Sequence, residues 1–175
     1  MSKTVIRFSL NEKDIDRAIR EVNKFKEDFR KKVDTYRKRI AEEIAVQASL
    51  NFGNSIVDDV IKGRSPRRPD VQVSVSDRGS VSVVVADGED AVWCEFGSGV
   101  YHNGAVGSSP NPYGNDLGFT IGSYGKGYGK KQAWGYYNKD GELVLTRGTP
   151  ASMPMYNAAQ EVLRKSVEIA REVFG

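Results

Sequence analysis

Three residues with reactive side chains lie close together near the middle of the chain: Cys94, Glu95 and His102. A thiol with a histidine base and a carboxylate would suit a small hydrolase or nuclease. However, His102 is the only histidine of the chain, and nothing in the spacing forces its ring against Cys94. One histidine cannot supply a multi-histidine metal site, and one cysteine cannot form an internal disulfide. We therefore expect no catalytic and no metal-binding residues, and a reduced, structural Cys94.

Two further patterns raise the question of phosphate or metal chemistry. The glycine-rich stretch GSYGKGYGKK at 122–131 lacks the G-x-x-x-x-G-K-[ST] spacing of a phosphate-binding loop. The carboxylate pair Asp58 and Asp59 falls in a predicted strand, where neighbouring side chains point to opposite faces, and Glu89 and Asp90 fall in a predicted turn. Neither pair makes a natural acid and base couple. The sequence therefore predicts no cofactor and no enzyme activity.

Basic side chains gather in two predicted loops, at 63–70 and 122–131, where tyrosines accompany the second group. Such loops suit phosphate contact and base stacking, so a nucleic-acid-binding module is the alternative hypothesis. The net charge of +3 is too small to argue for nucleic acid by itself. Loops rich in tyrosine, glycine and lysine also make adaptable protein-contact surfaces. The candidate interface residues are Arg64, Arg67, Arg68, Tyr101, Tyr124, Lys126, Tyr128, Lys130 and Lys131.

A long amphipathic helix is predicted over 10–52, with Ser9 as its cap and Glu12 completing a capping box. No Gly or Pro interrupts this range before Gly53, and apolar residues recur at three- and four-residue steps from Ile15 onward. An unbroken helix of this length spans about 60 Å, more than a domain of this size needs to cover its core. Packing on a neighbouring subunit is one explanation, and two helices, or one bent helix, is the other.

Alternating apolar residues predict strands within 53–96, the last of them over 91–96, with hairpin turns at 77–80 and 86–90. A flexible loop is expected over 97–132, a second hairpin over 133–146 that can join the same sheet, and a final helix over 155–174. The prediction is a single α+β domain. It has a long N-terminal helix, an antiparallel sheet with a long inserted loop, and a C-terminal helix packed on that sheet.

The chain shows no sign of a membrane segment or an export signal. No window approaches the roughly 18 apolar residues that a membrane span requires, and the N-terminus soon turns acidic. A lone cysteine also suits a reducing compartment. We expect assembly in the host cytoplasm and no membrane partner.

The stretches WCEFGSGVY, AWGYYNKDGELVLTRGTPASMP and MYNAAQEVLRKSVEIAREVF follow one another in an order that resembles a bacteriophage family. It is the tail-component family of long-tailed phages, whose members act at the neck as tail-completion or head-tail connector proteins. The residues that carry the resemblance are Glu95, Phe96, Gly97, Ser98 and Gly99, then Trp134, Tyr136 and Tyr137, then Gly148, Pro150 and Pro154. In this pattern Phe96, Gly97, Gly99, Gly148, Pro150 and Pro154 are expected to form structural turns.

The resemblance implies a structural virion protein of the phage neck that acts without an active site. Its partners would be further copies of itself in a ring, expected to be a hexamer, together with phage head-completion or connector proteins and the tail-terminator protein. Weak contact with DNA in the channel is compatible with this role. The overlong helix and the segment 97–132 would then serve as contact surfaces between subunits and between layers.

Overall fold

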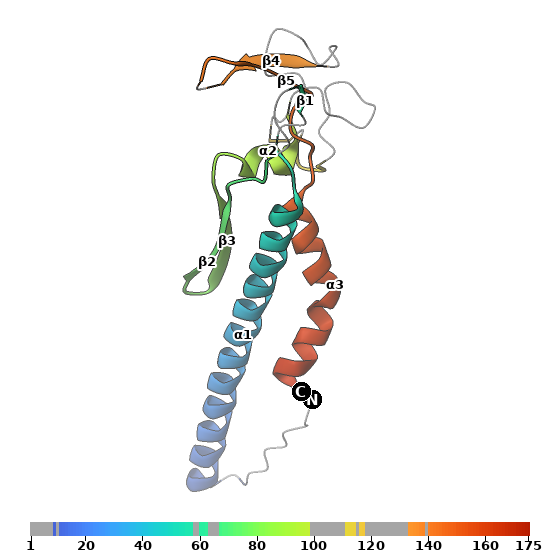
Figure 1. The fold of residues 1–175 in the computed structure, drawn as a ribbon. Coiled ribbons are helices and arrows are strands. Elements are labelled where there is room, and N and C mark those ends of the chain that lie inside the picture. Colours follow the sequence, from blue (N-terminus) through green and yellow to red (C-terminus); the bar gives the residue numbers. More distant parts are fainter. Residues whose placement is uncertain are drawn as a thin grey trace.

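The structure is a computed structural model that describes residues 9, 11–57, 60–62, 67–98, 111–114, 116–117, 133–138 and 140–175. Its elements in chain order are α1 (Glu12–Asn54), β1 (Val60–Lys62), β2 (Gln72–Arg78), β3 (Val81–Asp87), α2 (Ala91–Phe96), β4 (Trp134–Tyr137), β5 (Leu143–Thr146) and α3 (Pro154–Phe174). The α+β class, with a long N-terminal helix, antiparallel strands and a closing C-terminal helix, is confirmed. The molecule is elongated along α1 (Figure 1).

The first helix is continuous over its 43 residues, so the alternative of two helices is wrong. Its cap is Asn11 rather than the predicted Ser9, because the Asn11 side chain accepts a hydrogen bond from the backbone N–H of Asp14 at 2.9 Å. Ser9 instead hydrogen-bonds the Asp14 carboxylate. Acidic residues in the first turn, Glu12 and Asp14, also favour a helix start here through the helix dipole.

Two separate antiparallel sheets are present among the described residues, rather than one shared sheet. The β2–β3 hairpin turns at Gly79, as predicted, and lies against α1. Arg37 of α1 ties the hairpin down by hydrogen-bonding Asp77 and Ser82. The second sheet has the order β1-β5-β4 and lies beyond the C-terminal end of α1 (Figure 1).

Residues 91–96 form the short helix α2, so the predicted strand at this place is wrong. A run of six mostly apolar residues is too short to show whether its period is that of a strand or of a helix. The residues that become buried are three and four positions apart, which is the spacing of a helix. As a helix, the segment buries Ala91, Cys94 and Glu95 on one side. Cys94 joins a core cluster with Ala91, Phe52 and Val57. The turn at 86–90 therefore leads into a helix.

The C-terminal helix α3 packs chiefly along the upper half of α1 (Figure 1). Ala158, Val162 and Ile169 are buried on its inner face. The ring of Phe174, at the end of α3, lies 5.8 Å from Phe29 and 6.0 Å from Tyr36 of α1. The two helices thus share an apolar seam that ends near Phe29.

Candidate functional site: the corner between α2 and α3

Two of the three groups of residues that carry the family resemblance meet where α2 ends and α3 begins, whereas the third group, Trp134, Tyr136 and Tyr137, lies in β4. This corner, which we call the α2–α3 corner, consists of residues 94–98, residues 148–156 and Asn111. Its parts come from segments about 50 residues apart in the sequence, and α2 and α3 are in contact there. The described positions among those expected to form turns are therefore joined in space.

Glu95 is the centre of the corner, because its carboxylate caps the N-terminus of α3. It accepts hydrogen bonds from the backbone N–H of Met155 at 2.8 Å and of Tyr156 at 3.0 Å. The residue at the ordinary cap position, Met153, provides no side-chain acceptor and has a positive φ of 53°. Pro154 starts the helix and has no N–H to satisfy. A residue distant in sequence thus supplies the missing helix cap.

The carboxylate of Glu95 is buried, with 9% of the residue exposed. Burial raises the pKa of Glu95, while the N–H groups of Met155 and Tyr156 and the amide of Asn111 act in the opposite direction. The Asn111 amide donates to Glu95 Oε1 at 2.9 Å. These donors surround both oxygens of the Glu95 carboxyl group and fasten α2 to the start of α3.

Gly97 permits the close approach of the two chain segments. Its φ is 81°, in the region that favours glycine, and a Cβ at this position would lie 3.1 Å from the Cβ of Ala151. The next residue pairs with the opposite segment: Ser98 N–H donates to the Thr149 carbonyl, and Thr149 N–H donates to Ser98 Oγ, both at 2.9 Å. The Phe-Gly-Ser part of the motif therefore fastens α2 to the segment before α3.

Other predicted turn residues have matching places in the corner. Gly148 has a φ of 102° and donates its N–H to Thr146 Oγ1 at 2.8 Å. Pro154 is fully buried at the first turn of α3, and Pro150 is half-buried in the segment before it. Phe96 is the last residue of α2. Gly99 lies outside the described residues.

Cys94 is fully buried beneath the corner, and its backbone carbonyl accepts a hydrogen bond from Met153 N–H at 3.1 Å. Burial raises the pKa of the thiol to about 12, so the sulfur stays protonated at neutral pH. A buried thiol of this kind does not suit a nucleophile. His102, the base of the hydrolase hypothesis, lies outside the described residues.

Two of the basic interface candidates are tied to the chain itself. Arg67 holds the Asp90 carboxylate through two nitrogens, at 2.6 and 2.9 Å, and Arg68 donates to the Gly53 carbonyl at 2.7 Å. Burial opposes ionisation of Asp90, yet the Arg67 guanidinium and the N–H of Asp70 hold the pKa of this carboxyl below its usual value. The other candidates, Arg64, Tyr101, Tyr124, Lys126, Tyr128, Lys130 and Lys131, lie outside the described residues.

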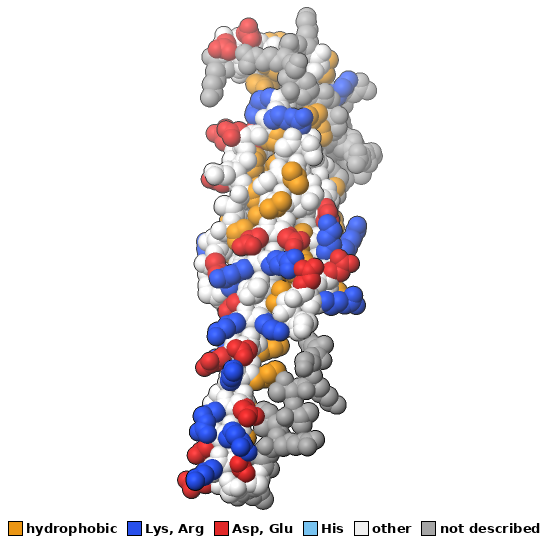
Figure 2. Space-filling view, turned by 60° about the horizontal axis from the view of Figure 1, so that its bottom comes forward, with side chains coloured by type: hydrophobic (Ala, Val, Ile, Leu, Met, Phe, Trp, Pro, Cys, Tyr) orange, Lys and Arg blue, Asp and Glu red, His pale blue; other side chains and the backbone are white. Residues whose placement is uncertain are grey.

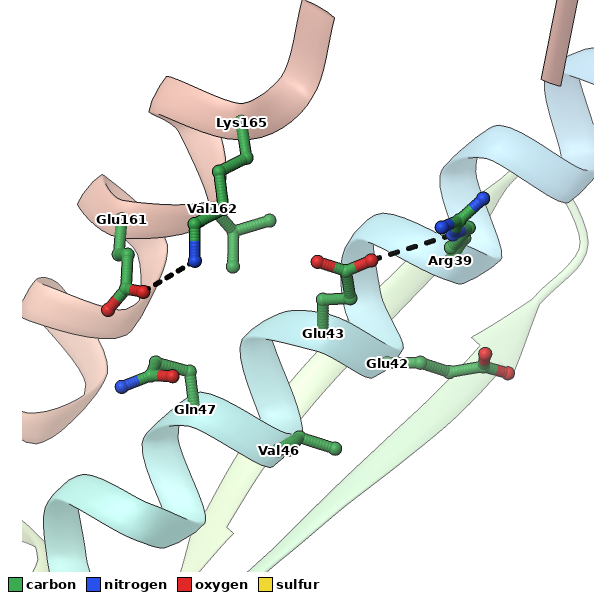
Figure 3. A pocket seen from close by; sticks show the side chains of 8 residues that line it. All are labelled: Arg39, Glu42, Glu43, Val46, Gln47, Glu161, Val162 and Lys165. Atoms are coloured by element: carbon green, nitrogen blue, oxygen red, sulfur yellow. Dashed lines mark hydrogen bonds and ion pairs between the residues drawn. The ribbon is translucent and has the colours of Figure 1, made fainter. Parts of the chain in front are cut away.

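A groove between α1 and α3 is a concave feature of the described surface (Figure 3). Its lining is mostly charged and contains two ion pairs: Lys165 pairs with Glu161 at 2.7 Å, and Arg39 pairs with Glu43 at 3.5 Å. Within the described ranges, no three side chains of the metal-binding types cluster together. Each of these two ion pairs lies within one helix, and Arg39 also pairs with Glu172 of α3 at 2.6 Å, which joins the two helices.

The partners of two residues, Asn111 and Asp90, are not evident from the sequence. Asn111 is 2% exposed and bonds Glu95, although it lies within the segment interpreted as a flexible loop. Its side chain also accepts from Tyr113 N–H at 2.9 Å, an Asx turn that the sequence Asn-Pro-Tyr-Gly indicates. Asp90 directly precedes α2 and forms an ion pair with Arg67. Its partner lies 23 residues away, and no local pattern identifies it.

No protein-family model matches this chain, and comparison with curated proteins and with solved structures finds no match. The family resemblance therefore depends on short motifs alone, those that meet at the α2–α3 corner and the aromatic residues of β4. No helix among the described residues has the length and apolar content to cross a membrane.

Proposed function

We propose that this chain is a structural virion protein of the phage neck, a tail-completion or head-tail connector component that forms a ring between head and tail. It acts through protein-protein contacts and is not an enzyme. Its neighbours are copies of itself, in a ring proposed to be hexameric, the head-completion or connector protein on one side, and the tail terminator on the other.

The observation that carries this proposal is the capping of α3 by Glu95. The Glu-Phe-Gly-Ser motif and the Gly-Thr-Pro segment before α3 are the sharpest parts of the resemblance, and they form one hydrogen-bonded unit. Two short matches that fold into one hydrogen-bonded unit support the resemblance better than two matches at unrelated places in the fold would. The buried, protonated Cys94 also favours a role without covalent chemistry.

The exposed surface gives independent support for assembly. Large apolar side chains on α1 stay exposed well beyond the end of α3, including Ile19 at 52% and Phe25 at 55% exposure. Lys, Arg, Asp and Glu are interspersed over the rest of the face in Figure 2, without a field of one sign. This pattern suits contact with protein better than contact with nucleic acid.

The nucleic-acid alternative receives less support. Arg67 and Arg68 both hydrogen-bond groups of the chain itself, so phosphate contact by these two residues competes with internal bonds. This alternative predicts retention on DNA that falls steeply with salt and is lost when Arg67, Arg68, Lys130 and Lys131 are replaced by alanine. Retention unchanged by these replacements would reject the alternative.

The neck assignment is tested by deleting the gene from the phage genome and imaging the lysate by electron microscopy. We expect filled heads and complete tails that stay unjoined, and joining restored when the chain is supplied from a plasmid. Normal particles at normal titre in the deletion would contradict the proposal. A defect in head filling or tail length would place the protein elsewhere in the assembly.

A further inference from the structure

The N-terminal part of α1 extends beyond everything that packs on it among the described elements. Figure 1 shows α1 continuing past the ends of both α3 and the β2–β3 hairpin. The end of α3 is marked by the Lys32 ammonium, which donates to the Phe174 carbonyl at 3.4 Å. From Phe29 back to Glu12 the helix continues for roughly 25 Å, at 1.5 Å per residue. We call residues 12–29 the α1 extension.

An apolar stripe runs along the α1 extension and continues the seam between α1 and α3. Where α3 covers the stripe, at Tyr36 and Ile40, the side chains are half-buried. Further toward the N-terminus the same stripe is exposed. Its exposed members are Ile15, Ile19, Val22, Phe25, Phe29 and Val33. Their spacing of three and four residues is that of a helix that packs on a second helix.

Charges beside the stripe decide which way a partner helix can run. Asp14, Glu21 and Asp28 follow one another at seven-residue steps along one flank, whereas Lys26 lies near the other flank. An antiparallel copy would bring the acidic flank against itself. A parallel copy would place Glu21 of one chain near Lys26 of the next, in both directions.

We propose that the α1 extension packs against the α1 extension of a second copy of this chain, parallel and in register. This inference rests on the proposed ring, because it names the surface and the orientation by which subunits of the ring meet. A parallel arrangement is what cyclic symmetry about an axis along the helices requires. The antiparallel arrangement would instead turn every second subunit upside down.

The contact is too short to hold two chains together firmly by itself. The α1 extension contains between two and three heptads, fewer than the three to four that stable coiled coils sustain. Association in solution should therefore depend on concentration and become firm only when several copies close a ring. Covalent trapping is the appropriate measurement.

Variants of the full chain with one added cysteine test the arrangement by disulfide trapping. Ile15→Cys and Val22→Cys place a thiol on the stripe, and Asp16→Cys is the matched control on an adjacent face. The buried Cys94 keeps the wild type as a clean baseline. A disulfide requires Cα atoms within about 7 Å, whereas an antiparallel pair centred on Val22 would separate the two copies of position 15 by about 21 Å. We expect Ile15→Cys and Val22→Cys to cross-link about ten-fold faster than the control.

Each other outcome overturns the inference in a distinct way. Cross-linking of Val22→Cys without Ile15→Cys would indicate the antiparallel arrangement. If neither variant cross-links in the full chain, but both cross-link after removal of residues 2–8, the N-terminal residues of the same chain cover the apolar stripe. Cross-linking of neither in both forms would exclude a second copy.

A charge exchange provides a second test that needs no cysteine. Glu21→Lys alone should weaken concentration-dependent association in sedimentation velocity, and Glu21→Lys combined with Lys26→Glu should restore it. Strengthening by Glu21→Lys alone would contradict the parallel arrangement, since it would mean that acidic flanks face each other.

Failure of this inference can be told apart from failure of the proposed function. If electron microscopy shows rings but these cross-links do not form, only the α1 extension is rejected as the contact surface. If the cross-links form but deletion of the gene leaves heads joined to tails, only the neck assignment is rejected.

Discussion

The helix cap supplied by Glu95 gives the sharpest prediction about stability. In Glu95→Gln the side chain keeps its shape and one oxygen, which can still accept from Tyr156 N–H and from the Asn111 amide. The other oxygen becomes an NH2 group that faces Met155 N–H, a donor against a donor. The substitution also removes the negative charge from the N-terminus of α3.

The expected loss follows from these changes. One charge-assisted hydrogen bond in a buried site contributes about 1.5 to 3 kcal/mol. A charge at a helix N-terminus contributes about 0.3 to 1 kcal/mol more. We expect the free energy of unfolding to fall by about 2 to 4 kcal/mol, which lowers Tm by about 5 to 15 °C in a chain of this size.

Urea unfolding followed by circular dichroism at neutral pH measures this loss. The matched control is Glu89→Gln, an exposed carboxylate six residues earlier in the chain, which should stay within about 0.5 kcal/mol of the wild type. Equal stability of Glu95→Gln and the wild type would refute the reasoning. It would mean that burial keeps the carboxyl protonated, so that the amide replaces it without loss.

Three further predictions concern other parts of the structure. The lowered pKa of Asp90 in the folded chain contributes stability above the unfolded value of 3.8, and this stability is lost as the pH falls through the folded pKa. Asp90→Asn should therefore lower the free energy of unfolding at neutral pH and make it fall less steeply below about pH 4. Urea unfolding at a series of pH values measures this, and a pH dependence equal to that of the wild type would contradict it. Gly97→Ala should lower the free energy of unfolding by about 1 kcal/mol more than Gly79→Ala does, as measured by thermal unfolding. Both positions need a positive φ, but only Gly97 lies close to another segment. Equal losses of stability would show that the close contact with Ala151 does not matter. Deletion of residues 118–131, which spares Asn111, should leave the circular dichroism spectrum and Tm near those of the wild type while blocking head-tail joining. If the deletion variant is unfolded, this segment is needed for the fold and is not only a contact surface.

The sequence was sufficient for elements whose pattern is long or whose turn chemistry is explicit. The apolar period of α1 extends over more than ten turns, with no Gly or Pro until its final turn, and the structure confirms one helix there. The hairpin turns at Gly79 and Gly141 were predicted from their Asp and Gly residues, and both glycines have a positive φ.

The sequence was insufficient where a short segment depends on distant contacts. Residues 91–96 read equally well as a strand or a helix, and the buried environment of Cys94 and Glu95 decides for the helix. The motif around Glu95 was found, but its purpose was not, because the N–H groups that it caps lie about 60 residues away. Asn111 could not be recognised as a partner of Glu95 before its turn was placed beside α2.

The central claim, a structural role at the phage neck, is tested most directly by locating the chain in finished particles. A chain tagged after Gly175, incorporated into infectious phage and labelled with gold, should be found at the junction of head and tail and at no other place. Label on the tail tip or inside the head, or virions that lack the protein altogether, would contradict the account.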